Sequence, residues 1–77
     1  MSNFTIRIAK VTTGEPGTLL CHGVAAGDVL VQAMAMSNGD DVTGIFMQVV
    51  PGQDVIVQAK QGPGIECVLV LHRYTNG

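Results

Sequence analysis

Glycine and proline interrupt this chain about every ten residues, and that spacing limits it to short structural elements. The 77 residues include ten glycines and three prolines. The runs between them alternate apolar and polar side chains with the two-residue period of a β-strand. No apolar pattern of helical period is long enough for a useful helix. The sequence therefore predicts an all-β chain, and its length allows one domain, residues 1–77.

The alternating runs predict six strands, at residues 4–11, 18–24, 28–36, 42–50, 54–60 and 65–74. Two of the turns between them have suitable residues. Asn38-Gly39 tolerates the positive φ of a tight hairpin, and Pro51-Gly52 suits the central positions of a type II turn. Short strands with glycine-rich turns favour a six-stranded antiparallel β-sandwich or a small barrel, with a jelly-roll-like arrangement among the forms.

Two segments of the chain have similar sequences. Residues 28–33 read DVLVQA, and residues 54–59 read DVIVQA. Two interpretations stay open: an internal repeat of two β-hairpins, or unrelated hairpins that converge on one pattern. In both cases Asp28 and Asp54 are predicted to accept hydrogen bonds from backbone amides of their own turns.

Charged side chains are scarce. They make up 13% of the residues, where about 25% is usual. Four basic residues against six acidic ones, with only three aromatic residues, give neither a basic stripe nor a stacking platform for nucleic acid. The first residues do not read as a secretory signal, and no apolar run is long enough to span a bilayer. We therefore expect neither nucleic acid nor a membrane as a partner.

Chains this small usually need a disulfide, a metal ion or a partner surface to be stable. A surface with so few charged side chains favours the partner surface.

The two cysteines could form a stabilising disulfide. Cys21 and Cys67 each lie inside an apolar strand pattern, which predicts buried reduced thiols. A disulfide and a reactive or metal-bound thiol stay open as alternatives. His22 and His72 could complete a zinc site or a Cys–His nucleophile. Strand alternation, however, points each histidine away from its nearby cysteine. We therefore assign no catalytic, cofactor-binding or metal-ligating residue, and we do not expect an enzyme.

The candidate functional residues are apolar contact residues. The methionines have flexible side chains that suit a pliable contact surface, with packing in the core as the alternative. The N-terminal segment is free to cross to a neighbouring subunit. The predicted interface residues are Asn3, Phe4, Ile6, Met34, Met36 and Met47.

Several runs also resemble a known class of proteins. They are Gly27-Asp28-Val29-Leu30, residues 38–43 with Phe46, Asp54-Val55-Ile56-Val57-Gln58, and Val68-Leu69-Val70-Leu71. Over residues 24–72 the chain resembles small β-rich virion proteins of tailed bacteriophages, the capsid cement or decoration proteins. The resemblance implies a structural protein on the capsid surface of the virion, made in the host cytoplasm. It also implies a homo-oligomer, dimer or trimer, that binds the major capsid protein and has no enzyme activity.

Two other functions remain as alternatives. A small ligand- or glycan-binding β module, at a phage tail or a cell surface, would present aromatic side chains over its ligand. The chain offers Phe4, Phe46 and Tyr74 and no tryptophan. A small enzyme would need a thiol of lowered pKa at Cys21 or Cys67.

Overall fold

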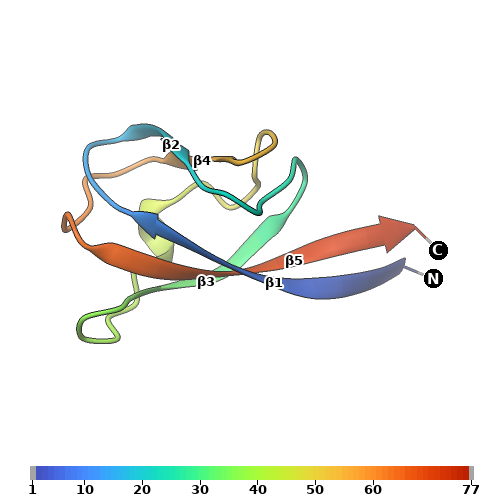
Figure 1. Ribbon diagram of the computed structural model, residues 1–77, viewed down its shortest axis with the longest axis horizontal. Coiled ribbons are helices and arrows are strands. Elements are labelled where there is room, and N and C mark those ends of the chain that lie inside the picture. Colours follow the sequence, from blue (N-terminus) through green and yellow to red (C-terminus); the bar gives the residue numbers. More distant parts are fainter. Residues whose placement is uncertain (1, 77) are drawn as a thin grey trace.

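The structure, a computed structural model, describes residues 2–76, with side chains for residues 3–75. Its regular elements are five strands and one short 3-10 helix (Figure 1): β1 (Ser2–Thr12), β2 (Gly17–Leu20), β3 (Val29–Ala35), η1 (Thr43–Ile45), β4 (Val55–Gln58) and β5 (Glu66–Asn76). These residues contain no α-helix, so the all-β prediction is confirmed. In the same part of the chain, no helix is long and apolar enough to cross a membrane.

The larger sheet joins the two ends of the chain. Its strand order is β1-β5-β3, and both strand pairs are antiparallel. β1 and β5 pair residue for residue over their whole lengths, from Ser2 opposite Asn76 to Thr12 opposite Glu66. β3 pairs with the other edge of β5 and contains one β-bulge. Because the first and last strands are neighbours, Ser2 and Asn76 lie side by side (Figure 1).

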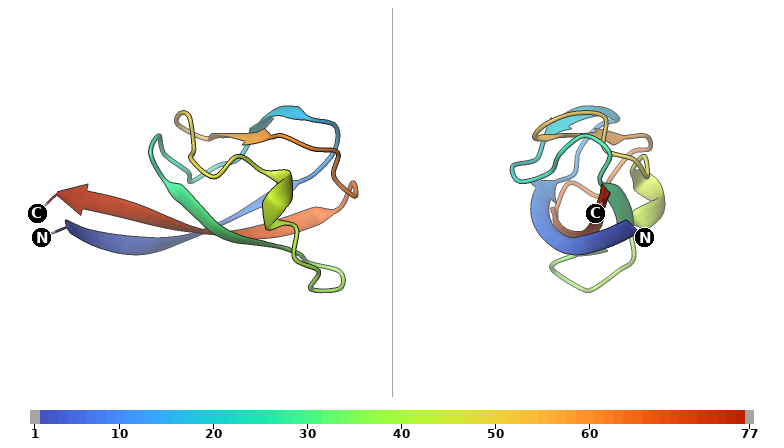
Figure 2. Two further views of the ribbon diagram at one scale, coloured as in Figure 1. Left: turned by 180° about the vertical axis from the view of Figure 1, so that it is seen from behind. Right: turned by 90° about the vertical axis from the view of Figure 1, so that its right-hand side faces the viewer.

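The smaller sheet, β2-β4, lies over one face of the larger sheet (Figure 2). The core fills the space between them, with Leu69 and Leu71 of β5 and Ile56 of β4 among its buried members. The two sheets do not close into one, so the layers are arranged as in a sandwich and the barrel alternative is wrong. Five strands also fall short of the eight of a jelly roll.

The strand predicted at residues 42–50 is wrong, and residues 2–76 form five strands rather than six. Thr43–Ile45 forms η1 instead. The Asp41 carboxylate accepts hydrogen bonds from the backbone N–H and the hydroxyl of Thr43, and the same hydroxyl accepts one from the Ala33 N–H at 2.9 Å. Such side-chain bonds compete with extended backbone. The residues that follow make only isolated bridges, first to β4 and then to β3.

The two similar units, residues 19–33 and 45–59, form reciprocal turns, and the hairpin interpretation is wrong for the first of them. β2 pairs with β4 and β3 pairs with β5, so the strands of the first unit do not pair with each other. In the second unit Phe46 does form an antiparallel bridge with Gln58. Between the units, the Val24 carbonyl accepts a hydrogen bond from the Asp54 N–H at 2.9 Å, and the Val50 carbonyl accepts one from the Gly27 N–H at 2.9 Å. Each unit thus binds the turn of the other.

The two aspartates behave differently from each other. Asp28 accepts a hydrogen bond from the Ala25 N–H of its own turn at 2.9 Å, as predicted. Asp54 accepts one at 3.0 Å from Gly23, which belongs to the turn of the other unit. The side chain of Asp54 therefore adds to the contacts between the two units.

β1 and β5 continue past the body of the molecule as two strands. β3 begins at Val29, opposite His72, so residues 73–76 of β5 have only residues 2–5 of β1 beside them. We call residues 2–5 and 73–76 the terminal ribbon. It projects from one end of the molecule (Figures 1 and 2), which measures 38 Å along its longest axis against 23 and 18 Å along the others.

Candidate interaction surface

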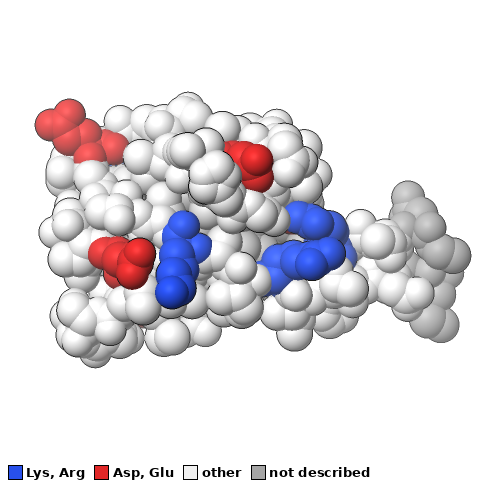
Figure 3. Space-filling model, viewed as in Figure 1, with Lys and Arg blue, Asp and Glu red and all other residues white. Residues whose placement is uncertain are grey.

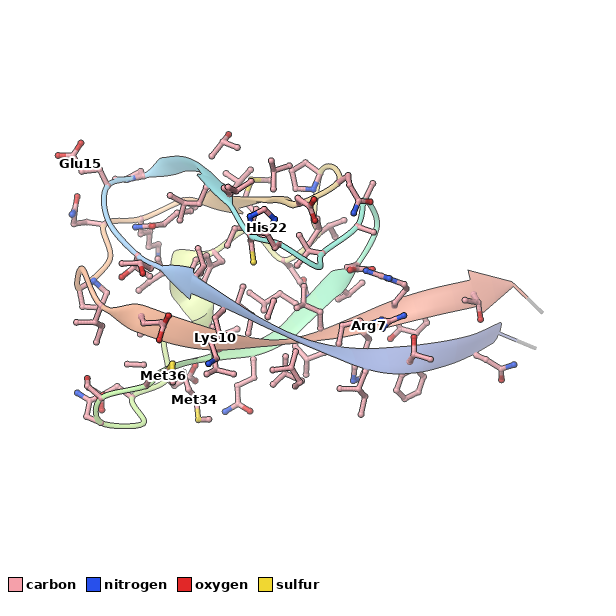
Figure 4. All side chains as sticks on the ribbon, in the orientation of Figure 1. Arg7, Lys10, Glu15, His22, Met34 and Met36 are labelled. Carbon is pink, nitrogen blue, oxygen red and sulfur yellow. The ribbon has the colours of Figure 1, made fainter. Side chains whose placement is uncertain are left out.

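The face of the larger sheet turned away from β2 and β4 is apolar, and no second layer covers it within residues 2–76. Ala9 and Val11 of β1 point into the core, so the residues that alternate with them point outward. We call this surface the outer face: Phe4, Ile6 and Ile8 of β1, Val68, Val70, His72 and Tyr74 of β5, and Met34 with Met36 at the end of β3. Figure 4 shows the two methionines on this side of the sheet.

The strand register arranges these residues in rows across the sheet. The opposite pairs are Phe4 with Tyr74, Ile6 with His72, Ile8 with Val70, and Val68 with Met34. Side chains directly opposite each other on one face are within contact distance, so the apolar surface is continuous. The neighbouring charged residues are Lys10, opposite Val68, and Glu66, opposite Thr12, both at the end away from the terminal ribbon. Figure 3 shows that charged groups are also few over one side of the molecule.

Two of the three aromatic residues meet a histidine at the base of the terminal ribbon. The ring of Phe4 stacks on His72, with centroids 4.3 Å apart and planes 23° apart. Tyr74 lies 5.7 Å from Phe4 and 6.1 Å from His72. Phe4 and Tyr74 are each about half exposed. The stacked rings form a stiff apolar platform at one end of the outer face.

On the opposite side of the sheet, a buried ion pair attaches the terminal ribbon to the body. Arg73 Nε and Nη2 donate to Asp28 Oδ1 and Oδ2, each at 2.9 Å, and Nη2 also donates to the Gly23 carbonyl at 3.0 Å. Asp28 is 1% exposed. The Arg73 hydrogen bonds hold the pKa of Asp28 below its ordinary value, although burial acts in the other direction. This two-point contact fixes β5 against the loop of residues 23–28.

The structure gathers four of the six predicted interface residues on the outer face. Ile8 belongs to the same surface and is 62% exposed, although it is not among the predicted interface residues. The signal was present, because alternation from Phe4 through Ile6 puts Ile8 on the same side of the strand. The four residues on this face are Phe4, Ile6, Met34 and Met36.

The other two predicted residues lie elsewhere. Asn3 alternates with Phe4 along β1, which places it on the opposite side of the strand. Met47 is 53% exposed, but its N–H donates to the carbonyl of Val57 in β4 at 2.9 Å. It therefore lies beside the smaller sheet and takes no part in the outer face.

The cysteines and histidines do not come together as catalytic pairs. Cys21 and Cys67 are free and buried, and burial is the main cause that raises the pKa of both thiols. A nucleophilic thiol needs a lowered pKa. His22 has 81% of its side chain exposed, next to buried Cys21, whereas Cys67 faces the core and His72 the outer face. Strand alternation separates Cys67 from His72 as predicted, whereas Cys21 and His22 follow the end of β2 at Leu20 and lie outside any strand. Among residues 2–76, no three His, Cys, Asp or Glu side chains are placed to hold a metal ion.

A hollow of about 570 Å³ lies between the turn at residues 37–41 and the turn at residues 61–65. Its two carboxylates are engaged locally. Asp40 accepts a hydrogen bond from the Asn38 amide at 3.0 Å, and the hydrogen bonds from Thr43 lower the pKa of Asp41. These bonds stabilise the turn that the sequence predicted at residues 37–41.

The outer face is the candidate functional site of this chain. A broad, nearly continuous apolar sheet face suits contact with another protein surface, whereas small molecules bind in concave pockets. Comparison of the chain with protein-family models, with curated proteins and with solved structures gives no match.

Proposed function

We propose that this is a structural protein of a tailed-phage virion, a decoration or cement protein that stabilises the head through protein–protein contacts. The chain is made in the host cytoplasm, associates with itself, and binds the major capsid protein on the capsid surface. The observation that carries the proposal is the apolar outer face. The resemblance of residues 24–72 to capsid cement proteins supports a capsid as the larger assembly.

The outer face is at the upper end of the apolar patches that monomers expose and somewhat smaller than one side of a standard interface. Its six most exposed members are between 37% and 62% exposed, which amounts to about 600 Å² at roughly 200 Å² for a large apolar side chain. The largest apolar patch on a typical monomer is about 300–600 Å², and a standard interface buries about 800 Å² on each partner. The six residues are Phe4, Ile6, Ile8, Met34, Met36 and Tyr74.

The buried thiols also favour a non-enzymatic function. A raised pKa leaves Cys21 and Cys67 protonated at neutral pH, and a protonated thiol is a poor nucleophile. The backbone contacts of the two similar turns and the Asp28–Arg73 pair serve to hold the fold together. The proposed function needs only a rigid surface, which these contacts supply.

Co-sedimentation with isolated phage capsid shells tests the proposal. Ile8→Ser removes apolar surface from the middle of the outer face, where the side chain is 62% exposed. Burial of that surface against a partner is worth roughly 1–2 kcal/mol, so we expect binding to be about 10-fold weaker. Leu20→Ser is the matched control, because Leu20 is 66% exposed on β2, in the smaller sheet. The proposal fails if the unchanged protein does not bind shells, or if Ile8→Ser weakens binding no more than Leu20→Ser.

The aromatic platform favours glycan or small-ligand binding as a second candidate. Phe4 and Tyr74 present exposed rings on the terminal ribbon, and sugars commonly stack on such rings. A glycan-array signal that disappears in Tyr74→Ala but persists in Ile8→Ser would favour this function over capsid decoration. Arrays without any signal would remove it.

A further inference from the structure

One edge of β1 has no partner within residues 2–76. β1 pairs only with β5, and in an antiparallel strand the backbone groups of alternate residues point to opposite edges. The N–H of Thr13, just after β1, donates to the Ile65 carbonyl on the β5 side at 3.1 Å. The carbonyl of Lys10 instead accepts from the Cys21 thiol at 3.7 Å. The even-numbered residues of β1 therefore turn their N–H and C=O groups to the open edge.

This edge lacks three of the features that usually prevent pairing, namely proline, a bulge and short length. Its charged side chains, which natural edge strands also use as protection, are Arg7 and Lys10. β1 is eleven residues long, contains no proline or glycine, and pairs with β5 without a bulge. Residues 3–8 are all exposed, so this stretch of the edge is accessible, whereas farther along the strand the Lys10 carbonyl meets the Cys21 thiol of the body. A strand of this kind is a template for another strand.

The sequence of β1 identifies a second copy of the chain as the strand that fits. Residues 4–8 read Phe-Thr-Ile-Arg-Ile, so apolar and polar side chains alternate symmetrically about Ile6. An antiparallel partner is read in reverse, and this pattern is the same in both directions. Pairing centred on Ile6 sets Phe4 of one copy opposite Ile8 of the other. It also sets Arg7 opposite Thr5, so the two copies of Arg7 do not face each other as like charges.

We propose that two copies of this chain pair β1 with β1, antiparallel and about a two-fold axis at Ile6. The two larger sheets then form one continuous sheet of six strands, β3-β5-β1-β1-β5-β3. A two-fold contact of this kind is closed, because each copy uses its only open β1 edge. The two outer faces become one apolar surface of twice the area. The pairing deepens the proposed function, since it rests on self-association and gives the surface that would meet the shell.

Native mass and a proline variant give the first test. The Ile6 N–H points to the open edge, so Ile6→Pro removes a bond to the second copy and none to β5. We expect the unchanged protein at micromolar concentration to have twice the 8.0 kDa mass of one chain. We expect Ile6→Pro to have the mass of one chain with an unchanged far-ultraviolet circular dichroism spectrum, and Ile6→Val to remain dimeric.

A cysteine cross-link gives a second test that does not require the proline variant to fold. In the proposed register the two copies of Ile6 form a hydrogen-bonded pair with Cα atoms about 5.5 Å apart, within the range that a disulfide bridges. The two copies of Ile8 are offset by four residues along the strands, or about 13 Å. Under mild oxidation we therefore expect Ile6→Cys to form a cross-linked dimer and Ile8→Cys, the matched control on the same face, to form none.

The outcomes separate this pairing from the proposed function. A monomeric unchanged protein, a dimer that persists in folded Ile6→Pro, or cross-linking of Ile8→Cys in preference to Ile6→Cys would each overturn the β1 pairing. Capsid binding would still stand if shells bind the protein in those cases. Conversely, a dimer cross-linked at Ile6→Cys that fails to bind shells would support the pairing and remove the capsid function.

Discussion

Replacement of Arg73 by methionine tests how the terminal ribbon is held to the body. The guanidinium makes two hydrogen bonds of 2.9 Å to Asp28 and one of 3.0 Å to the Gly23 carbonyl. Methionine keeps a long unbranched stem and removes all three bonds. Asp28, at 1% exposure, is then a buried carboxylate whose remaining hydrogen bond comes from the Ala25 N–H.

The expected loss of stability is large for so small a domain. Removal of one partner from a buried pair costs about 3–5 kcal/mol. The guanidinium is 28% exposed, so we take the lower end, about 3 kcal/mol. A chain of this length has a total free energy of unfolding of about 4–12 kcal/mol. Arg73→Lys keeps the charge but not the two-point contact, and we expect it to lose about half as much.

Urea unfolding at pH 7, followed by circular dichroism, measures this loss. Arg7→Met is the matched control (Figure 4), because Arg7 is exposed on the same side of the larger sheet as Arg73 and forms no ion pair with a described residue. The charge of Arg7 is the smallest of the causes that lower the pKa of Asp28. We expect it to change stability by less than about 0.5 kcal/mol. If Arg73→Met is within 1 kcal/mol of the unchanged protein, the ion pair does not hold the ribbon as argued.

The effect should also depend on pH. Asp28 has a pKa below its ordinary value in the folded protein, mainly because of the hydrogen bonds from Arg73. The pair therefore stabilises the fold fully above the pKa of the unfolded state, about 3.9, and this contribution is lost as the pH falls through the folded-state pKa. In Arg73→Met, protonation of Asp28 removes the unpaired buried charge. We expect the difference in stability between the two proteins to shrink as the pH is lowered through this range.

Three further predictions concern buried groups. Burial raises the pKa of the Cys21 and Cys67 thiols, so iodoacetamide at neutral pH should label them only after unfolding; rapid labelling of the folded protein would support the small-enzyme hypothesis. Gln58 is 1% exposed, and its side-chain amide accepts from the Gly14 N–H at 3.1 Å and donates to the Gly14 carbonyl. We expect Gln58→Leu to lower the free energy of unfolding in urea by about 2–3 kcal/mol. A loss below about 0.5 kcal/mol would contradict a structural role. A methyl group on Gly62 would lie 2.5 Å from the Cβ of Thr13, whereas one on Gly14 would lie in open space. In thermal unfolding we expect Gly62→Ala to be destabilised by about 1–3 kcal/mol and Gly14→Ala to be nearly unchanged. Equal melting temperatures would refute the close contact.

Local pattern accounts for what the sequence predicted correctly. Strands β1, β3 and β5 follow clear alternation or apolar runs, and glycine marks the turns, as Gly39 does with its φ of 76°. The segment 42–50 also alternates, yet Thr43 is bonded by Asp41 on one side and Ala33 on the other. Those bonds combine neighbours in sequence with a residue of another strand, and the pattern of one segment does not reveal them.

The sequence pattern does not reveal contacts between residues that lie far apart in the chain. Nothing local indicates that residues 2–12 pair with residues 66–76 or that Arg73 reaches Asp28. Only the part of the candidate surface that lies on a single strand was predictable. Alternation put Phe4 and Ile6 on one face of their strand, but only the sheet order brings Met34 onto that face and leaves Met47 beside β4.

A strand that is apolar on both faces raises the question of which face the protein buries. In β5, Leu69 and Leu71 are buried, while Val68 and Val70 lie on the outer face. A shift of one residue would exchange the two sets. Both sets are aliphatic, but a shift would also turn Glu66 and His72 toward the core, so the hydrophobic effect favours the observed face. Arg73 favours the same face, because it alternates with the outer face and the observed register puts it beside Asp28.

We expect the ion pair to help specify the register as well as to stabilise the fold, and a double variant separates these two effects. Asp28→Asn with Arg73→Met removes both charges and keeps an acceptor for the Ala25 N–H. We expect it to lose less stability than Arg73→Met alone, because no unpaired charge remains. It should nevertheless lose uniqueness, with broadened amide resonances and binding of a hydrophobic dye. One sharp set of resonances without dye binding would show that core packing alone selects the buried face of β5.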